Sequence, residues 1–392
     1  MIITDAKAIK EVLSRGVENV IEKESLEKKL KIGNELRIKF GVDPTSPNIH
    51  IGRSVPLLKL RDLQNLGHKI VLIIGDFTGV IGDTSDKDSE RPMLTSEQVK
   101  SNMKNYIEQA GKVIDIKKCE IHYNSEWLGK LSYQEISTQA NVFSLSDFIS
   151  RENIKKRLDA GKRVSLRELI YPLMQGYDSV AIKADIEIGG TDQIFNILAG
   201  RELQRFYKQE PQDIIINPLI EGLDGRKMSS SWGNTINLFD SAYDIYGKVM
   251  SLNDSLIIKY FTITTRVDLE KIEEYKKELE SGANPRDIKM KLAFEMTKFY
   301  HSEEDANKAQ DYFVNTFTKK EIPTEVAELT PSEYDITSVL IEAGFAPSKA
   351  EARRNILQGG VKINQEEIKD PKFIVEKGSV VQKGKRFFVK IV

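Results

Sequence analysis

Residues 36–53 read LRIKFGVDPTSPNIHIGR, and this stretch indicates how the front of the chain folds. Apolar and polar side chains alternate over residues 36–40 before the chain meets Gly41 and Pro44, which is typical of a strand that ends in a tight turn. Gly52 then opens a run with apolar residues at helical spacing. A strand, a turn and a helix N-terminus predict a phosphate site, because backbone N–H groups and the helix dipole face the anion there.

A second informative segment, GRKMSSS, occupies residues 225–231, far from the first in sequence. It combines a glycine turn, a basic pair and three serines, while His50 lies at the mouth of the predicted helix in the first segment. Each segment alone is a weak signal. Together they predict that the protein activates a carboxylate with ATP.

Composition is that of an ordinary globular protein with two or three domains, since 392 residues with 40% apolar content can bury a sizeable core. No apolar run reaches the roughly 18 residues of a membrane span, and the N-terminus lacks the pattern of a signal peptide, so we expect a cytoplasmic protein. The single cysteine, Cys119, excludes an internal disulfide framework. Four scattered histidines predict no dedicated metal site.

Charge is distributed unevenly along the chain. From Tyr334 onward there are 11 Lys and Arg against 7 Asp and Glu, a balance of +4, whereas residues 1–333 carry 47 against 52, a balance of −5. A basic tail on an acidic body indicates a polyanionic partner. A solvated surface explains the same charge equally well.

Strand-like runs alternate with long helical stretches, which predicts an α/β fold with a doubly wound parallel sheet that binds a nucleotide. The runs are 69–74, 119–123, 186–188 and 213–217. No convincing strand occurs over residues 242–317, so a helical domain follows the sheet. The expected organisation is a Rossmann-like nucleotide-binding domain at 1–240, a helical domain at 241–321, a linker at 322–333 and a small α+β domain at 334–392.

Several motifs occur in an order that resembles the bacterial tyrosyl-tRNA synthetases, which belong to class I of the aminoacyl-tRNA synthetases. The motifs are GVDPT at 41–45, HIG at 50–52, YPLMQGYD at 171–178, GGTDQ at 189–193 and KMS at 227–229. The resemblance covers essentially the whole chain, and the ordered set is far more specific than any one member. It implies that the domain at 1–240 is catalytic, that the helical domain at 241–321 lies on the anticodon side and that the domain at 334–392 binds RNA. It also implies a homodimer, which the periodicity does not show.

The chemistry explains why basic residues gather in such a site. A carboxylate attacks the α-phosphate of ATP, so the enzyme needs positioning and positive charge on the departing pyrophosphate, not a protein nucleophile. The resemblance implies catalytic roles for Thr45, His50, Lys87, Arg91 and Lys227. It implies ATP contacts for Gly41, Asp43, His50, Gly52, Gly190, Asp192, Lys227, Met228 and Ser229, with magnesium carried by the nucleotide. Read alone, Lys87 and Arg91 are surface charges, and His50 is a structural histidine.

Amino-acid selection is predicted from the central segment. Tyr171, Gln175 and Asp178 stand at i, i+4 and i+7, which places them on one helical face. Without the other motifs this stripe reads as a solvated helix face. The resemblance implies that Tyr171, Gln175 and Asp83 hold the tyrosine ammonium, that Asp178 contacts the phenolic hydroxyl, and that Gln193 belongs to the same pocket.

The segment from about Tyr334 resembles a small RNA-binding domain that is shared with a ribosomal small-subunit protein. In the run SKAEARR at 348–354, Lys349, Arg353 and Arg354 lie near one helical face, which suits phosphate contacts. A solvated helix is the alternative. The predicted partner is tRNA(Tyr).

Three positions depart from the family pattern. Arg53 stands where the first motif usually ends in histidine, Ser230 where the loop motif often has a second lysine, and Lys39 where some members have a tyrosine that contacts the phenol. The Arg53 departure affects the contact to the nucleotide, and the Ser230 departure affects stabilisation of pyrophosphate. The Lys39 departure affects selection of the substrate hydroxyl. They leave the predicted core chemistry in place.

The predicted function is tyrosine–tRNA ligation: L-tyrosine and ATP form tyrosyl-adenylate and pyrophosphate, and the tyrosine then passes to the 3′-terminal ribose of tRNA(Tyr). The tryptophanyl sister family shares the fold and both ATP motifs, but Asp178 with Tyr171 and Gln175 favours tyrosine. A non-catalytic RNA-binding paralogue is the rival from a different class. The intact set of phosphate-contacting residues argues against that rival.

Overall fold

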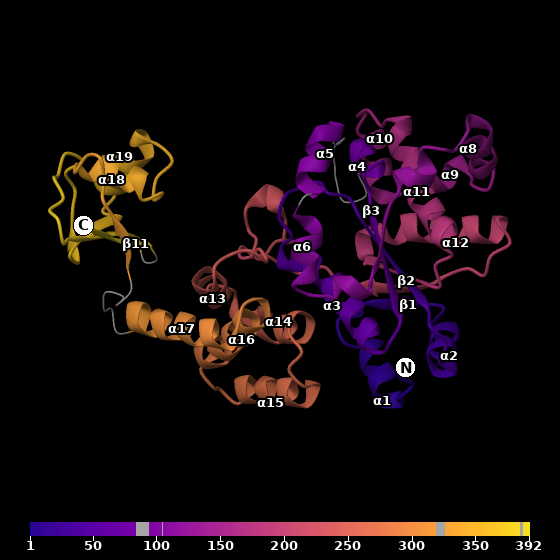
Figure 1. Cartoon of the computed structure of the whole chain (residues 1–392), viewed down its shortest axis with the longest axis horizontal. Coiled ribbons are helices and arrows are strands. Elements are labelled where there is room, and N and C mark those ends of the chain that lie inside the picture. Colours follow the sequence, from indigo (N-terminus) through magenta and orange to yellow (C-terminus); the bar gives the residue numbers. More distant parts are fainter. Residues whose placement is uncertain (84–93, 104, 319–325, 385–386) are drawn as a thin grey trace. The chain divides into compact units, whose positions relative to one another are not determined.

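The computed structural model describes residues 1–83, 94–103, 105–318, 326–384 and 387–392, which fold into two compact units, Met1–Glu303 and Glu304–Val392 (Figure 1). Two of the predicted site residues, Lys87 and Arg91, lie outside the described residues. The domain boundaries predicted at 240/241 and 321/322 stay predictions. None of the helices in these ranges is long and apolar enough to cross a membrane.

A six-stranded sheet forms the centre of the first unit. Its order is β1-β6-β5-β2-β3-β4; β1 pairs antiparallel with β6, and all other pairs are parallel. The strands are β1 (Asn19–Ile21), β2 (Arg37–Val42), β3 (Lys69–Ile74), β4 (Glu120–Tyr123), β5 (Ile186–Gly190) and β6 (Asp213–Asn217). The predicted doubly wound sheet is therefore confirmed, and the edge strand β1, only three residues long, is the strand that the periodicity missed.

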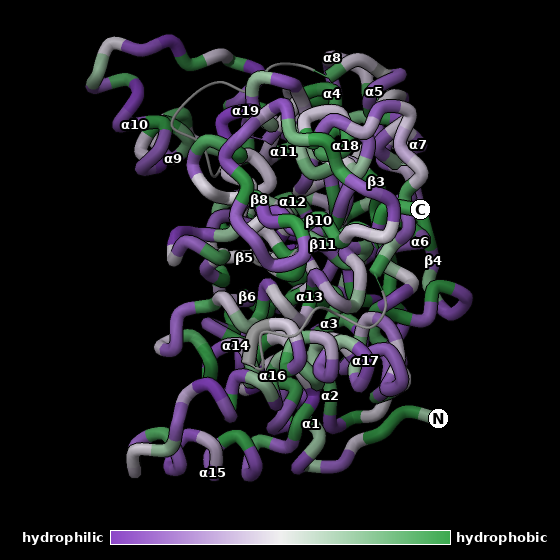
Figure 2. Tube along the Cα trace, turned by 90° about the vertical axis from the view of Figure 1, so that its left-hand side faces the viewer, coloured by the Kyte–Doolittle hydropathy of each residue, from purple (hydrophilic) through white to green (hydrophobic). Residues whose placement is uncertain are grey.

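The parallel strands are apolar on both faces because helices cover them. Ile214, Ile215 and Ile216 of β6 are all fully buried. On one face, Val71 and Ile73 of β3 form a cluster with residues that end the helix α11 (Leu166–Ile182). Charged residues dominate the outer helix α15 (Leu269–Glu280), which is largely purple in Figure 2.

The chain changes direction in the sheet between β2 and β5. From β2 it passes to β3 and β4 on one side, and from β5 to β6 on the other. Ligands bind at such a switch point, outside the carboxyl ends of the strands, because the loops diverge there and leave a crevice. Asp43 follows β2 at this edge, and Gly190 ends β5 beside it.

Two helices contribute side chains to the site. The helix α3 (Ile51–Asn65) begins beside the end of β2, and α11 begins at a capping box in which Ser165 and Glu168 exchange hydrogen bonds. The other helices of four residues or more that surround the sheet are α1 (Ala6–Val12), α2 (Lys23–Ile32), α4 (Thr78–Ile81), α5 (Ser96–Met103), α6 (Tyr106–Gly111), α7 (Ser125–Leu128), α8 (Tyr133–Ala140), α9 (Leu145–Ile149), α10 (Glu152–Asp159) and α12 (Ile194–Phe206).

The region expected to be helical contains α13 (Ala242–Met250), α14 (Ile257–Thr264), α15 and α16 (Pro285–Tyr300), with no strand among its described residues. Their packed faces are apolar: Tyr246, Tyr260 and Phe261 are completely buried. These helices belong to the same compact unit as the sheet.

The second unit contains α17 (Glu303–Phe313), apart from its first residue, and a small α+β fold. Its sheet has the order β7-β11-β10-β8-β9, and α18 (Ile336–Glu342) and α19 (Lys349–Leu357) share its apolar core. The strands are β7 (Ala327–Leu329), β8 (Val361–Ile363), β9 (Glu366–Glu367), β10 (Val380–Lys383) and β11 (Phe387–Ile391). The segment predicted as a linker thus supplies a strand, because β7 pairs in parallel with β11.

Candidate active site

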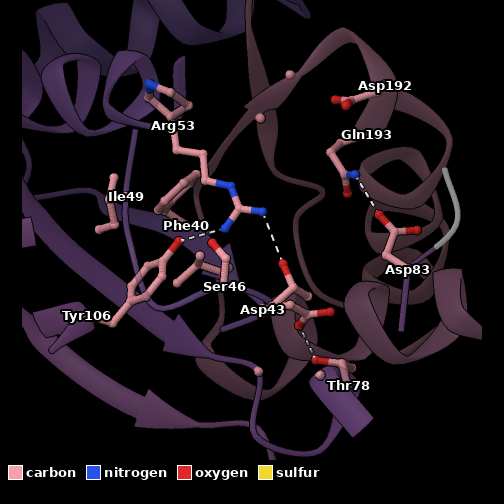
Figure 3. Close-up of a pocket in the computed structure, with 18 of the residues that line it drawn as sticks. Phe40, Asp43, Ser46, Ile49, Arg53, Thr78, Asp83, Tyr106, Asp192 and Gln193 are labelled. Carbon is pink, nitrogen blue, oxygen red and sulfur yellow. Dashed lines mark hydrogen bonds between the residues drawn. The ribbon is translucent and has the colours of Figure 1, made fainter. Parts of the chain in front are cut away.

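A cavity of about 850 Å³ opens at the carboxyl ends of β2, β3 and β5 (Figure 3). All the predicted catalytic, ATP and tyrosine residues that the structure describes line it. They are Gly41, Asp43, Thr45, His50, Gly52, Asp83, Tyr171, Gln175, Asp178, Gly190, Asp192, Gln193, Lys227, Met228 and Ser229. Residues that are up to 188 positions apart in sequence therefore surround one space.

The two signature segments meet at one wall of the cavity. Met228 is buried, and its Sδ atom accepts a hydrogen bond of 3.3 Å from the backbone N–H of Gly52. A Cβ atom on Gly52 would lie 3.0 Å from His50 Nδ1 and 3.2 Å from Ile220. Glycine therefore lets the start of α3 approach the imidazole, Ile220 and the KMSSS segment (residues 227–231) closely.

His50 is buried at the N-terminus of α3 and remains neutral over the working range of pH. Burial lowers its pKa to about 3, and the positive charges of Arg53 and Lys227 act in the same direction. Its Nδ1 atom has no hydrogen-bond partner among the residues that the structure describes. A neutral imidazole can donate a hydrogen bond from its N–H group to a phosphate oxygen, while the two neighbouring cations supply the positive charge.

The low pKa of His50 makes stability depend on pH. Between pH 6.5 and 3 the unfolded chain binds a proton at this imidazole that the folded chain does not, so the free energy of unfolding falls as the pH falls. The free energy of unfolding of the natural chain should therefore fall between pH 7 and pH 5. We expect this fall to be smaller in His50→Gln by about 2 kcal/mol, because the variant lacks the imidazole. Urea unfolding at both pH values measures this difference, and equal losses would contradict the assignment.

Arg53 and Lys227 bring positive charge to this part of the cavity. The Arg53 guanidinium donates to Thr45 Oγ1 at 3.0 Å and to the Tyr106 hydroxyl at 3.3 Å. The Lys227 ammonium lies 2.9 Å from Asp192 Oδ2. Figure 3 shows Arg53 directed toward Tyr106, with Asp192 on the opposite side of the cavity.

Acidic and amide groups occupy the remaining walls. Asp43 accepts hydrogen bonds from the Tyr171 hydroxyl at 2.8 Å and from Thr78 Oγ1 at 2.7 Å. The side-chain amide of Gln193 donates to Asp83 Oδ2 at 2.7 Å (Figure 3). Burial raises the pKa of Tyr171 well above its usual value, and the neighbouring carboxylates act in the same direction, so this phenol stays protonated and serves as a donor.

Asp178 lies at the deep end of the polar stripe on α11. Only 3% of the residue is exposed, and its carboxylate accepts from Trp127 Nε1 at 2.7 Å and from Asn124 Nδ2 at 3.4 Å. Burial raises its pKa to about 7, although Lys39 and the two hydrogen bonds act in the opposite direction. A carboxylate in this position can accept a hydrogen bond from a substrate hydroxyl at neutral pH.

Several residues of the site carry no sequence motif. Thr78, Asn124 and Trp127 hold Asp43 and Asp178, and Asn196 donates to Gln175 Oε1 at 3.0 Å. Single polar residues in short segments such as α7 gave no signal in the sequence. Only the place of Asn124 in the chain could have indicated its role. It directly follows β4, at the edge of the sheet where the carboxyl ends of the parallel strands meet.

Gly75, which follows β3, is a further residue that the motifs did not reveal. A Cβ atom there would lie 2.0 Å from Asp43 Oδ1 and 2.4 Å from Thr78 Oγ1. Gly75→Ala is therefore expected to lower the free energy of unfolding by about 1–3 kcal/mol, the usual cost of overpacking. Gly41→Ala is the matched control, because its Cβ would meet nothing within 4 Å. Urea unfolding of both variants tests this, and equal stability would contradict the expected clash.

Two of the departures from the family pattern, Arg53 and Ser230, line the cavity, whereas Lys39 lies completely buried in β2. The predicted RNA contacts, Lys349, Arg353 and Arg354, belong to the second unit, where α19 exposes all three. A weak ion pair of 3.8 Å joins Arg354 to Glu351.

Comparisons with known proteins agree with this geometry. A family model described as tRNA synthetases class I (W and Y) matches residues 31–318, and an S4 domain model matches residues 338–381. A tyrosine–tRNA ligase of Thermotoga maritima is 47% identical over 97% of this chain and 96% of its own length. A tyrosine–tRNA ligase of Francisella tularensis is 45% identical, with full coverage of both chains.

Solved structures show the same fold. The mitochondrial tyrosyl-tRNA synthetase of Aspergillus nidulans, truncated at its C-terminus, has a TM-score of 0.67 at 20% identity and covers 79% of this chain and 94% of its own. The Archaeoglobus fulgidus tyrosyl-tRNA synthetase, solved with L-tyrosine, has a TM-score of 0.62 at 22% identity, over 77% of this chain and 99% of its own. At these identities the likeness establishes the fold alone.

The sheet, the cavity at its switch point and the matched model define the class: the chain belongs to the class I tRNA synthetases of the W and Y type. Its full-length relatives then decide between the two branches. The chain is a member of the bacterial tyrosyl-tRNA synthetase family.

Proposed function

We propose that this protein is a tyrosine–tRNA ligase that activates L-tyrosine with ATP and transfers it to the 3′-terminal ribose of tRNA(Tyr). One observation carries the proposal most directly. The polar face of α11 and the two ATP segments line the same cavity, with Asp178 buried in it and Lys227 beside Asp192. A carboxylate that accepts a phenol and a cation that meets phosphates are the groups that this reaction needs.

The nucleotide is proposed to lie against the α3 N-terminus and the KMSSS segment. There Thr45, His50 and Lys227 act on the phosphates, and Gly190 and Asp192 approach the ribose, where a carboxylate can accept from hydroxyl groups. The proposed ATP contacts also include Gly41, Asp43, Gly52, Met228 and Ser229, all of which line the cavity. Magnesium enters as part of the nucleotide substrate. The roles proposed for Lys87 and Arg91 concern residues outside the described ranges.

Tyrosine is proposed to bind along α11. Its ammonium meets Tyr171, Gln175 and Asp83, its phenolic hydroxyl meets Asp178, and Gln193 completes the pocket. The contacts among these residues support the assignment, because Gln193 already holds Asp83 and Tyr171 already holds Asp43. Groups that are fixed before binding lose little conformational freedom when the substrate arrives.

The second unit is proposed to bind the tRNA through Lys349, Arg353 and Arg354. The S4 domain match and the exposure of α19 support this role. Contacts to phosphate make affinity fall steeply with salt. Binding of tRNA that is unchanged when all three are replaced by alanine would refute these contacts.

A homodimer in the cytoplasm is also proposed. Large apolar side chains are exposed over α8 to α11, which favours a second copy as the covering partner. They include Tyr133, Leu145, Ile149, Leu158, Leu166 and Ile170. Light scattering that gives the mass of a single chain at micromolar concentration would refute the dimer, and fractionation of cells tests the location.

The proposed function is tested by exchange of labelled pyrophosphate into ATP, with tyrosine, tryptophan and phenylalanine as parallel substrates. We expect exchange with tyrosine alone. Exchange with tryptophan would assign the chain to the sister activity. RNA binding without exchange would favour a non-catalytic paralogue.

A further inference from the structure

A complete ion pair lies inside the sheet beside the cavity, and its glutamate, Glu187, is one of the residues that line the cavity. Lys39 of β2 and Glu187 of β5 are register partners, and their charged groups lie 2.9 Å apart. Both side chains are completely or almost completely buried. Their neighbours in the same row are Val71 and Ile214, so the pair occupies positions that an ordinary parallel sheet fills with apolar residues.

Each donor of the lysine has a defined acceptor, and two of them belong to α11. The Lys39 ammonium donates to the backbone carbonyl of Gln175 and to Ser179 Oγ, both at 2.7 Å. Ser179 directly follows Asp178 in the chain. The lysine therefore attaches the turn that carries Gln175 and Asp178 to the centre of the sheet.

The glutamate orients the side chains around the same turn. Glu187 accepts from the Gln175 amide at 3.3 Å, from Ser179 Oγ at 3.1 Å and from the amide of Gln212. Asn196 holds the other end of the Gln175 amide. Gln175 is thus fixed from both sides, with Glu187 as the acceptor for its N–H group.

We infer that the buried Lys39–Glu187 pair is a positioning pair for tyrosine selection, because it fixes the α11 turn that carries Gln175 and Asp178. This inference rests on the proposed function. Buried ion pairs contribute little net stability, since desolvation opposes the attraction between the charges. A role in positioning the substrate wall explains why charges occupy this row.

The electrostatic part depends on the charges that surround Asp178. Burial raises its pKa, Lys39 from β2 lowers it, and Glu187 from β5 raises it. Its partners on α7 and β4, Trp127 and Asn124, are neutral donors. Asp43 and Asp83 are further acidic groups, and both raise the pKa of Tyr171, which stands on the same face of α11 as Asp178.

These opposing signs define the test. The value of kcat/KM for tyrosine in pyrophosphate exchange reports groups of the free enzyme, and we expect it to fall as the pH drops below the pKa of Asp178. Lys39→Met should move the midpoint of that fall upward by about one pH unit or more, as expected for the loss of a nearby opposite charge. Glu187→Gln should move the midpoint downward, because the variant removes a negative charge that raises the pKa of Asp178 and leaves the positive charge of Lys39 unbalanced. A purely structural role predicts no such opposition.

Lys59→Met is the matched control, because Lys59 of α3 is equally buried and pairs with Asp62 away from the cavity. It should lower stability and leave the midpoint unchanged. Unmoved midpoints, or shifts of both variants in the same direction, would overturn the inference. If Lys39→Met does not fold, the Glu187→Gln variant decides alone: a downward shift of its midpoint supports the inference, and an unmoved midpoint overturns it. If the natural protein shows no pyrophosphate exchange with tyrosine, the proposed function itself is refuted. That result is distinct from unmoved midpoints in the variants, which refute only the positioning role of the ion pair.

Discussion

Replacing Lys227 by methionine is expected to lower kcat for tyrosine-dependent pyrophosphate exchange by about 10²–10³-fold, the usual effect of removing one preorganised charge or donor from a developing anion. The ammonium lies in the cavity beside Asp192 and close enough to His50 to lower the pKa of that imidazole. Methionine keeps the length of the side chain and removes its charge. Initial rates of exchange at saturating tyrosine and ATP measure the effect.

Lys259 offers a closely matched control for this variant. Its ammonium pairs with Glu221 at 2.7 Å, and the side chain is as exposed as that of Lys227, 35% against 34%. It does not line the cavity. Lys259→Met should exchange pyrophosphate at the natural rate, and an equal loss in both variants would show that the general loss of a lysine ion pair, not phosphate stabilisation, is responsible.

Asp178→Asn is expected to lower kcat/KM for tyrosine by about 10–100-fold and to leave KM for ATP nearly unchanged. The carboxylate is the acceptor proposed for the phenolic hydroxyl, and a hydrogen bond to a charged group contributes about 1.5–3 kcal/mol. The asparagine keeps the size of the side chain but loses the charge. Steady-state exchange with each substrate varied in turn gives both constants.

Asp213→Asn controls for the loss of a buried carboxylate. Asp213 begins β6, is 1% exposed and pairs with Lys29 outside the cavity. Its replacement should reduce stability and leave the constants for tyrosine and ATP unchanged. Equal losses for tyrosine and ATP in Asp178→Asn would mean that this residue supports the whole site and does not select the amino acid.

Much of the site could be predicted from the sequence because its residues lie in local patterns. Tyr171, Gln175 and Asp178 share a helical face by spacing alone, and the structure brings all three to the cavity. The sheet was predictable for the same reason, since the apolar runs of β3 and β6 are continuous. The strand β7 was not, because its three residues become a strand only by pairing with β11, about 60 residues later.

The groups that tune the site were hidden from the sequence. Lys39 and Glu187 are 148 positions apart, and nothing local indicates that strand register makes them neighbours. Trp127 and Asn124 meet Asp178 in the same way, across segments that only the fold brings together. Long-range hydrogen bonds and burial therefore decide the charge state of Asp178.

The sequence by itself determined the α/β class, the family and the residue types of the site, because these depend on periodicity and on ordered motifs within short segments. Only the tertiary structure decided that His50 is neutral, that Asp178 has a pKa of about 7, and that a buried ion pair lies beside the cavity. The physical reason is that desolvation and charge interactions depend on distance in space, and residues far apart in the chain set that distance.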